Sequence, residues 1–137
     1  MTSMVRDEKS FQLLYASRLA PERTWEVMKE VADAARRNNP AHGITGALLF
    51  DGERFCQLIE GEKAAVHALM DNIASDARHS DVKLLFAGMA QQGRVTQRWA
   101  SGYCDAHELE AFGRAPGSGD RSVLETFLSL LRRADID

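Results

Sequence analysis

Residues 44–60, which read ITGALLFDGERFCQLIE, decide how this chain folds. Two apolar runs, 44–50 and 54–60, flank Asp51-Gly52-Glu53, and Asp-Gly is among the strongest short-range signals for a hairpin turn. The segment therefore predicts two antiparallel strands joined by a tight turn.

The sequence before this hairpin predicts a strand and a helix. Residues 11–17 are short and rich in apolar side chains, as is typical of a strand. Residues 21–38 indicate a helix, because Pro21 suits the first helical position, where its missing N–H is not needed. The apolar stripe expected on this helix consists of Trp25, Val27, Met28, Val31, Ala34 and Ala35.

The sequence after the hairpin repeats the pattern. A second helix is predicted over 62–75, since apolar residues recur there at i, i+3, i+4 and i+7. These residues are Val66, Leu69, Met70 and Ile73. A fourth strand is predicted over 82–90, with Val82, Leu84 and Phe86 expected on one face, and a fifth over 95–103.

This order of elements is that of an α+β, ferredoxin-like βαββαββ sheet with both crossover helices on one face. The tail supplies a cover for the other face, because the linker 115–119 precedes a terminal helix with one apolar side. That side consists of Val123, Leu124, Phe127, Leu128, Leu130 and Leu131. We therefore divide the chain into an N-terminal tail (1–10), a central domain (11–104) and a C-terminal helical extension (105–137).

Length and charge exclude several classes of protein. The 137 residues, 45% of them hydrophobic, predict one domain. Seventeen Lys and Arg against 20 Asp and Glu give a net charge of −3, which argues against nucleic acid or a membrane surface as partner. No apolar run approaches the roughly 20 residues of a membrane helix, and no secretory signal is expected. Two cysteines favour the reducing cytoplasm.

The sequence carries no catalytic or metal-binding motif that we recognise. It lacks Gly-x-Gly-x-x-Gly, a Walker loop and His-Glu-x-x-His, and its four histidines and two cysteines lack the spacing of a metal site. Cys56 is expected to be a small buried hydrophobe, and Cys104, at a strand end, to be partly exposed. We expect a protein that is not an enzyme.

One polar residue stands where the strand pattern calls for an apolar one. Gln57 shares a strand face with Phe55 and Ile59, and a buried amide requires hydrogen-bond partners. Tyr15 in the first strand can donate its phenolic O–H to that amide. Two plain alternatives remain open: a satisfied pair in the core, or a Gln at an exposed edge of the sheet.

Six spaced motifs together resemble the BLUF family, the flavin-based sensors of blue light, over about residues 11–104. They are 14–17 (LYAS), 38–39 with 43–50 (NN and GITGALLF), 51–52 (DG), 55–61 (FCQLIEG), 76–79 (DARH) and 99–103 (WASGY). The resemblance implies a ferredoxin-like domain that binds FAD without a covalent bond, between its two crossover helices.

The resemblance also implies the photochemistry. Tyr15 would be the photoactive tyrosine and Gln57 the glutamine between its phenol and the flavin ring. Light would drive electron and proton transfer from the tyrosine to the flavin, after which the hydrogen bonds of the glutamine are rearranged. Such a sensor absorbs slightly further to the red while it is lit.

Four further cofactor contacts are implied by the same motifs. Asn39, assisted by Asn38, would bond the edge of the isoalloxazine ring. Arg78 and His79 would contact the ribityl-phosphate side, where a guanidinium suits phosphate geometry. For Arg78, a surface loop with solvated charges is the competing interpretation.

The chain departs from the family pattern where the output begins. The usual Trp-x-Met reads Trp99-Ala100-Ser101 here, and these two positions, Trp99 and Ser101, would relay the signal. Two arrangements are expected: either Ser101 hydrogen-bonds Gln57 directly, or the strand holds Trp99 in its place. Trp99 is also open to a plainer interpretation as core filling.

We therefore expect a short, stand-alone blue-light photoreceptor, homo-oligomeric and acting on a downstream signalling protein. Two other classes stay open: a redox flavin protein on the same scaffold, and an interaction module that does not respond to light. The colour of the purified protein, and its response to blue light, separates the three.

Overall fold

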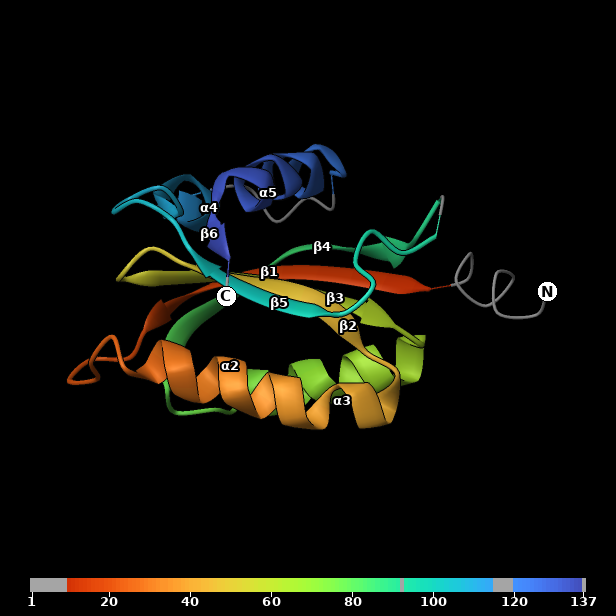
Figure 1. Ribbon diagram of the computed structural model, residues 1–137, viewed down its shortest axis with the longest axis horizontal. Coiled ribbons are helices and arrows are strands. Elements are labelled where there is room, and N and C mark those ends of the chain that lie inside the picture. The colour runs from red at the N-terminus through yellow and green to blue at the C-terminus, as the bar shows by residue number, and fades with distance from the viewer. Residues whose placement is uncertain (1–9, 92, 115–119, 137) are drawn as a thin grey trace.

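The computed structural model describes residues 10–91, 93–114 and 120–136 and contains one mixed sheet of six strands. Helices α2 (Val27–Asn38) and α3 (Lys63–Ala74) cover one face of the sheet, and α4 (Glu110–Arg114) and α5 (Ser122–Arg133) lie on the other (Figure 1). The strands are β1 (Phe11–Leu19), β2 (Thr45–Phe50), β3 (Arg54–Gly61), β4 (His79–Met89), β5 (Trp99–Tyr103) and β6 (Asp135–Ile136), and the short 3-10 helix η1 (Pro40–His42) follows α2. The predicted α+β class is confirmed.

The strand order is β4-β1-β3-β2-β5-β6. The first four strands pair antiparallel in the ferredoxin-like order, and β2 and β3 form the predicted hairpin. Asp51 Oδ1 accepts from the backbone N–H groups of Glu53 and Arg54 at 3.0 and 2.8 Å, which fixes the turn. β5 runs parallel to β2, and it begins at Trp99 rather than at the predicted Val95.

Helix α2 begins at Val27, so the predicted start at Pro21 is wrong. Pro21 instead occupies the second position of a turn in which the Arg23 N–H donates to the Ala20 carbonyl at 3.1 Å. Glu22 has φ +70°, as the third position of a type II turn requires. The fixed φ of proline suits this turn as well as a helix start. The turn leaves Trp25 outside the helix and 65% exposed, so Trp25 does not belong to the predicted stripe.

The expectation that Val82, Leu84 and Phe86 share one face of β4 is also wrong. Leu14 is opposite Phe86 and Tyr15 is opposite Leu84, so Leu85 is the extra residue of a β-bulge. Phe86 therefore lies on the α5 side of the sheet, whereas Val82 packs with Tyr15 on the helix α3 side. Leu84 is 48% exposed.

Apolar clusters fill both faces of the sheet. On the α5 side, Leu124, Phe127 and Leu130 are buried against strand residues, so the predicted cover is confirmed. Helix α4 adds Phe112 to this cluster and was not predicted. On the opposite side α2 and α3 bury residues of their own apolar stripes.

Some predictions fall on residues outside the described ranges. They are the linker 115–119 and, except for Ser10, the N-terminal tail 1–10. Cys56 is buried, Cys104 is half-buried and neither forms a disulfide, as expected. Among the residues that are described, no helix combines the length and the apolar character needed to cross a membrane.

Candidate functional site

Tyr15 and Gln57 face each other at the centre of the sheet. They are paired in the register of β1 and β3, and their relative exposures are 1% and 2%. The Tyr15 hydroxyl donates to Gln57 Oε1. Because Gln57 lies on an inner strand and is buried, the interpretation as an exposed edge residue is wrong.

Burial controls the ionisation of this phenol. Desolvation raises the pKa of Tyr15 far above its usual value, and the charges of Cys56 and Asp76 raise it further. Tyr15 therefore holds its proton at every physiological pH. The protonated hydroxyl is consequently a hydrogen-bond donor to Gln57 Oε1.

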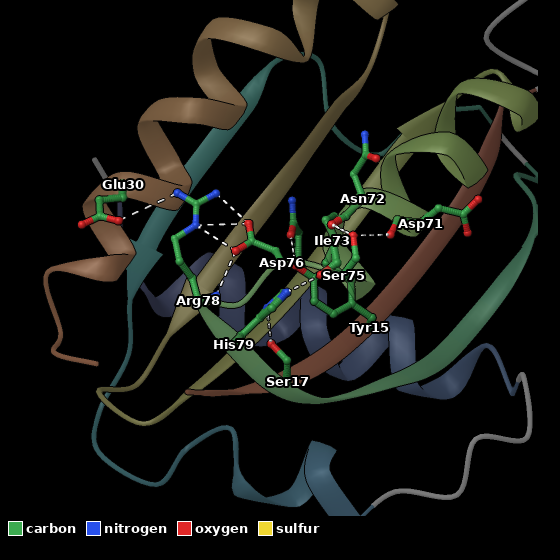
Figure 2. A network of polar contacts seen from close by, with 11 residues as sticks. Tyr15, Ser17, Glu30, Asp71, Asn72, Ile73, Ser75, Asp76, Arg78 and His79 are labelled. Carbon is green, nitrogen blue, oxygen red and sulfur yellow. Dashed lines mark hydrogen bonds and ion pairs between the residues drawn. The ribbon is translucent and has the colours of Figure 1, made fainter. Parts of the chain in front are cut away.

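A cavity of about 210 Å³ opens beside this pair, between α2 and α3. Its lining includes six of the predicted site residues: Tyr15, Asn38, Asn39, Gln57, Arg78 and His79. The structure thus brings together, around one space, residues from β1, α2, β3 and the start of β4. Figure 2 shows Tyr15, His79 and the Asp76–Arg78 pair around this site.

Asn39 presents an unsatisfied donor at this cavity. It lies just after α2, at the C-cap position, and is only 3% exposed. Its side-chain Nδ2 is buried and has no hydrogen-bond partner among the described residues. Because an unpaired buried donor is unfavourable, this amide fits a bound group that carries acceptor atoms at its edge. The carbonyl-bearing edge of an isoalloxazine is such a group.

Arg78 is held by carboxylates at the cavity (Figure 2). Its Nε donates to Asp76 Oδ1 at 3.1 Å and its Nη2 to Asp76 Oδ2 at 2.7 Å, a bidentate pair. Glu30 of α2 lies 3.9 Å from Arg78 Nη1. The side-chain hydrogen bond from Arg78 is the largest of the effects that lower the pKa of Asp76. Arg78 is thus oriented by two elements and is not a freely solvated loop residue.

His79 is fixed by two hydrogen bonds. Nε2 lies 2.7 Å from the Ile73 carbonyl and Nδ1 lies 3.0 Å from Ser17 Oγ (Figure 2). A carbonyl only accepts, so Nε2 carries a proton. The ring meets Tyr15 edge-on, with centroids 6.1 Å apart. His79 therefore forms a rigid wall of the site.

Ser101 and Trp99 lie on the same sheet face but outside this cavity. Ser101 is in register with Leu48, which is in register with Gln57, so one strand separates Ser101 from the glutamine. The Ser101 hydroxyl accepts from Arg36 Nη2 at 3.4 Å. Trp99 is 8% exposed and packs with α2, and its buried Nε1 lacks a partner within the described residues.

Several lining residues were not identified from the sequence. They are Val31, Ala34, Ala35, Leu69, Asn72, Ile73 and Asp76. Two signals were available. The first is that α2 carries small side chains, Ala34 and Ala35, where it faces α3. The second is that Asp76 stands two residues before Arg78, within reach of a bidentate pair.

Comparison with known proteins gives one family. Residues 11–102 match the model of the BLUF family, described as sensors of blue-light using FAD. The blue light- and temperature-regulated antirepressor BluF of Escherichia coli is 32% identical over 82 residues, which are 60% of this chain and 20% of that protein. This chain therefore spans about a fifth of that relative.

Solved structures agree with this match. BlsA in its photo-activated state has a TM-score of 0.68 and 26% identity, over 89% of this chain and 94% of that one. Klebsiella pneumoniae BlrP1 in a manganese and cy-diGMP complex has a TM-score of 0.64 and 30% identity, over 88% of this chain and 33% of that one. The matched family consists of sensory modules rather than catalytic ones. The chain belongs to the BLUF family and is a blue-light sensor that uses FAD.

Proposed function

We propose that the cavity between α2 and α3 is the FAD site and that Tyr15 and Gln57 are its photoactive pair. The observation that carries this proposal is the buried hydrogen bond from the Tyr15 hydroxyl to Gln57 Oε1 at the wall of that cavity. The unpartnered amide of Asn39 supports the same assignment.

The residues around the cavity fit the parts of FAD. Asn39, with Asn38 beside it, bonds the polar edge of the isoalloxazine, and the apolar residues of α2 and α3 bury its rings. Arg78 and His79 hold the ribityl-phosphate side, where the guanidinium is already oriented by Asp76. Bound FAD supplies the absorption of blue light and, once excited, a strong affinity for an electron.

Tyr15 is the electron donor of the light reaction. Its phenol stays protonated in the dark, so an electron passed from Tyr15 to excited FAD would leave together with the phenolic proton, which would move along the hydrogen bond to Gln57 Oε1 toward the flavin. Both the electron and the proton would then return to Tyr15, so that no net oxidation or reduction remains. Gln57 can then turn its amide, because the amide offers an acceptor on one side and donors on the other. The turned amide is the lit state.

The output passes through β5 and the terminal helix. Ser101 and Trp99 stand on β5 beside β2, whose Leu48 is the neighbour of Gln57. A change at Gln57 therefore reaches them through one intervening strand. We infer a sensor that is not itself an enzyme, located in the cytoplasm, assembled as a homo-oligomer and acting on a downstream protein. The antirepressor role in the name of the Escherichia coli relative supports a protein partner.

Absorption spectra before and after blue light test this proposal. The yellow protein should shift reversibly to the red, whereas Tyr15→Phe and Gln57→Ala should bind flavin and not shift. Tyr103→Phe is the matched control, since Tyr103 is 37% exposed and lies on β5, and it should keep the shift. A normal shift in Tyr15→Phe would refute the role of the phenol. A bound flavin without any shift in the unaltered chain would favour the redox or light-insensitive alternative.

A further inference from the structure

A buried carboxylate, Glu60, joins β1 to residues 95–96 on the sheet face opposite the FAD site. Glu60, in β3, has no exposed surface. Its Oε2 accepts from the Gln12 side chain at 2.9 Å and from the Val95 N–H at 2.8 Å. Its Oε1 accepts from the Thr96 N–H at 2.8 Å and from the Thr96 hydroxyl. Each carboxylate oxygen therefore has two donors, and Glu60 clamps the segment that enters β5.

The other side of this segment is tied to the loop that follows Asn39. Arg94 Nη1 donates to the Gly43 carbonyl at 2.9 Å and to the Thr45 hydroxyl at 3.2 Å. The Thr45 hydroxyl also lies 3.0 Å from Thr96 Oγ1. Residues 94–96 are thus held between Glu60 on one side and residues 43–45 on the other.

Gln12 carries the network on to the terminal helix. While its Nε2 donates to Glu60, its Oε1 accepts from Arg121 Nη1 at 3.2 Å. Arg121, at the N-cap of α5, also donates to the Met89 carbonyl at 3.1 Å and places its guanidinium 4.8 Å from the Phe86 ring centroid. A flipped Gln12 amide would face Glu60 with its oxygen and Arg121 with its donors, so it satisfies both partners in one orientation only.

We propose that Glu60, Gln12 and Arg121 form a polar relay that couples the entrance of β5 to α5 and carries the light signal through the sheet. This proposal rests on the proposed function and names the route of its output. The three residues are positioning residues, since none lines the cavity.

The location of the relay in the sequence supports this role. Glu60 follows Gln57 by three residues in β3, and Thr96 precedes Trp99 by three residues. A movement of either β3 or β5 therefore changes the geometry at Glu60. Because the carboxylate and the Gln12 amide are buried, a lost hydrogen bond there is not replaced by water. Because the Gln12 amide satisfies Glu60 and Arg121 in one orientation only, it links a displacement of the Glu60 carboxylate to the position of Arg121.

The test measures hydrogen exchange of α5 amides in the flavin-bound full chain, in the dark and under blue light, together with the red shift. We expect exchange in α5 to rise about fivefold or more in light, the lower end of ordinary coupling between sites. In Glu60→Gln and in Arg121→Gln this light-induced difference should fall below about twofold while the red shift persists. Arg132→Gln, an exposed arginine in the last turn of the same helix, is the matched control and should keep the full difference.

The outcomes separate the relay from the sensor. The relay is overturned if both relay variants keep the full light-induced difference in α5 hydrogen exchange. It is also overturned if the unaltered chain shows the red shift but no light-induced change in α5 exchange. If Glu60→Gln fails to fold, Arg121→Gln decides the question, because Arg121 is partly exposed and its loss leaves the clamp at Glu60 in place. An unaltered chain without any red shift overturns the proposed function, and the relay falls with it. If the network were purely structural, its loss would change α5 hydrogen exchange equally in the dark and in light, and the light-induced difference would stay the same.

Discussion

Replacing Asn39 with leucine should change folding and flavin binding in opposite directions. In the flavin-free protein the buried Nδ2 of Asn39 lacks a partner within the described chain, and such a donor costs about 1–3 kcal/mol. Leucine has a similar shape and no donor, so Asn39→Leu should raise the free energy of unfolding of the flavin-free protein by about 1 kcal/mol. The same change removes one hydrogen bond to the flavin, so the affinity for FAD should fall by about fivefold.

Two titrations measure these effects. Urea unfolding of the flavin-free protein gives the free energy of unfolding, and quenching of flavin fluorescence gives the affinity for FAD. Asn38→Leu is the control for stability, because Asn38 is exposed and its replacement should change the free energy by no more than about 0.5 kcal/mol. A less stable Asn39→Leu protein with unchanged FAD affinity would refute the assignment of Asn39 as a cofactor donor.

Three other changes test the fold and its ionisation. Because the pKa of Tyr15 is raised in the folded protein, the contribution of Tyr15 to stability is complete below about pH 10 and is lost as the pH rises further, by up to about 1.4 kcal/mol per pH unit. Urea unfolding from pH 9 to 11 should show this extra decrease in the free energy of unfolding. Tyr15→Phe should lack it. Gly46→Ala would place Cβ 2.0 Å from the Leu58 carbonyl oxygen, so thermal melting should show a loss of about 1–3 kcal/mol, whereas Gly113→Ala meets only the Arg54 side chain at 3.5 Å and should not destabilise. Phe127 is fully buried on the α5 side of the sheet, away from the cavity. Phe127→Ala should therefore lower the free energy of unfolding by about 3–5 kcal/mol in urea and still give a yellow protein.

The sequence predicted the parts of the fold that depend on periodicity and on turn chemistry. The hairpin at Asp51-Gly52 and the apolar face of α5 followed from local patterns that the tertiary structure keeps. Pro21 misled because the same fixed φ serves a helix start and a type II turn, and only the left-handed Glu22 separates the two. The bulge at Leu85 could not be predicted, since an extra residue in a strand leaves no mark in an apolar run.

In the candidate site, too, local patterns predict some features, whereas others depend on how distant segments pair or pack. Gln57 could be found because an amide on an apolar strand face breaks the pattern, and Tyr15 because its strand pairs with β3. The two-residue spacing of Asp76 and Arg78 allows their bidentate hydrogen bonds, but the position of the pair at the cavity depends on the path of the loop between α3 and β4, which a local pattern does not encode. The position of Ser101, one strand away from Gln57, depends on the parallel pairing of β5 with β2, which was not predicted.

In the proposed mechanism, one ladder of residue pairs would let both faces of the sheet respond to a change at Gln57. The pairs Tyr15–Gln57 and Gln12–Glu60 belong to the same β1–β3 register, three residues apart, and side chains alternate along a strand. One pair therefore faces the cavity and the other faces α5. Since a turned amide moves few atoms, its effect on the backbone is small, and only a buried group whose hydrogen bonds have no substitutes responds strongly to it. Glu60, with two donors on each oxygen, is such a group.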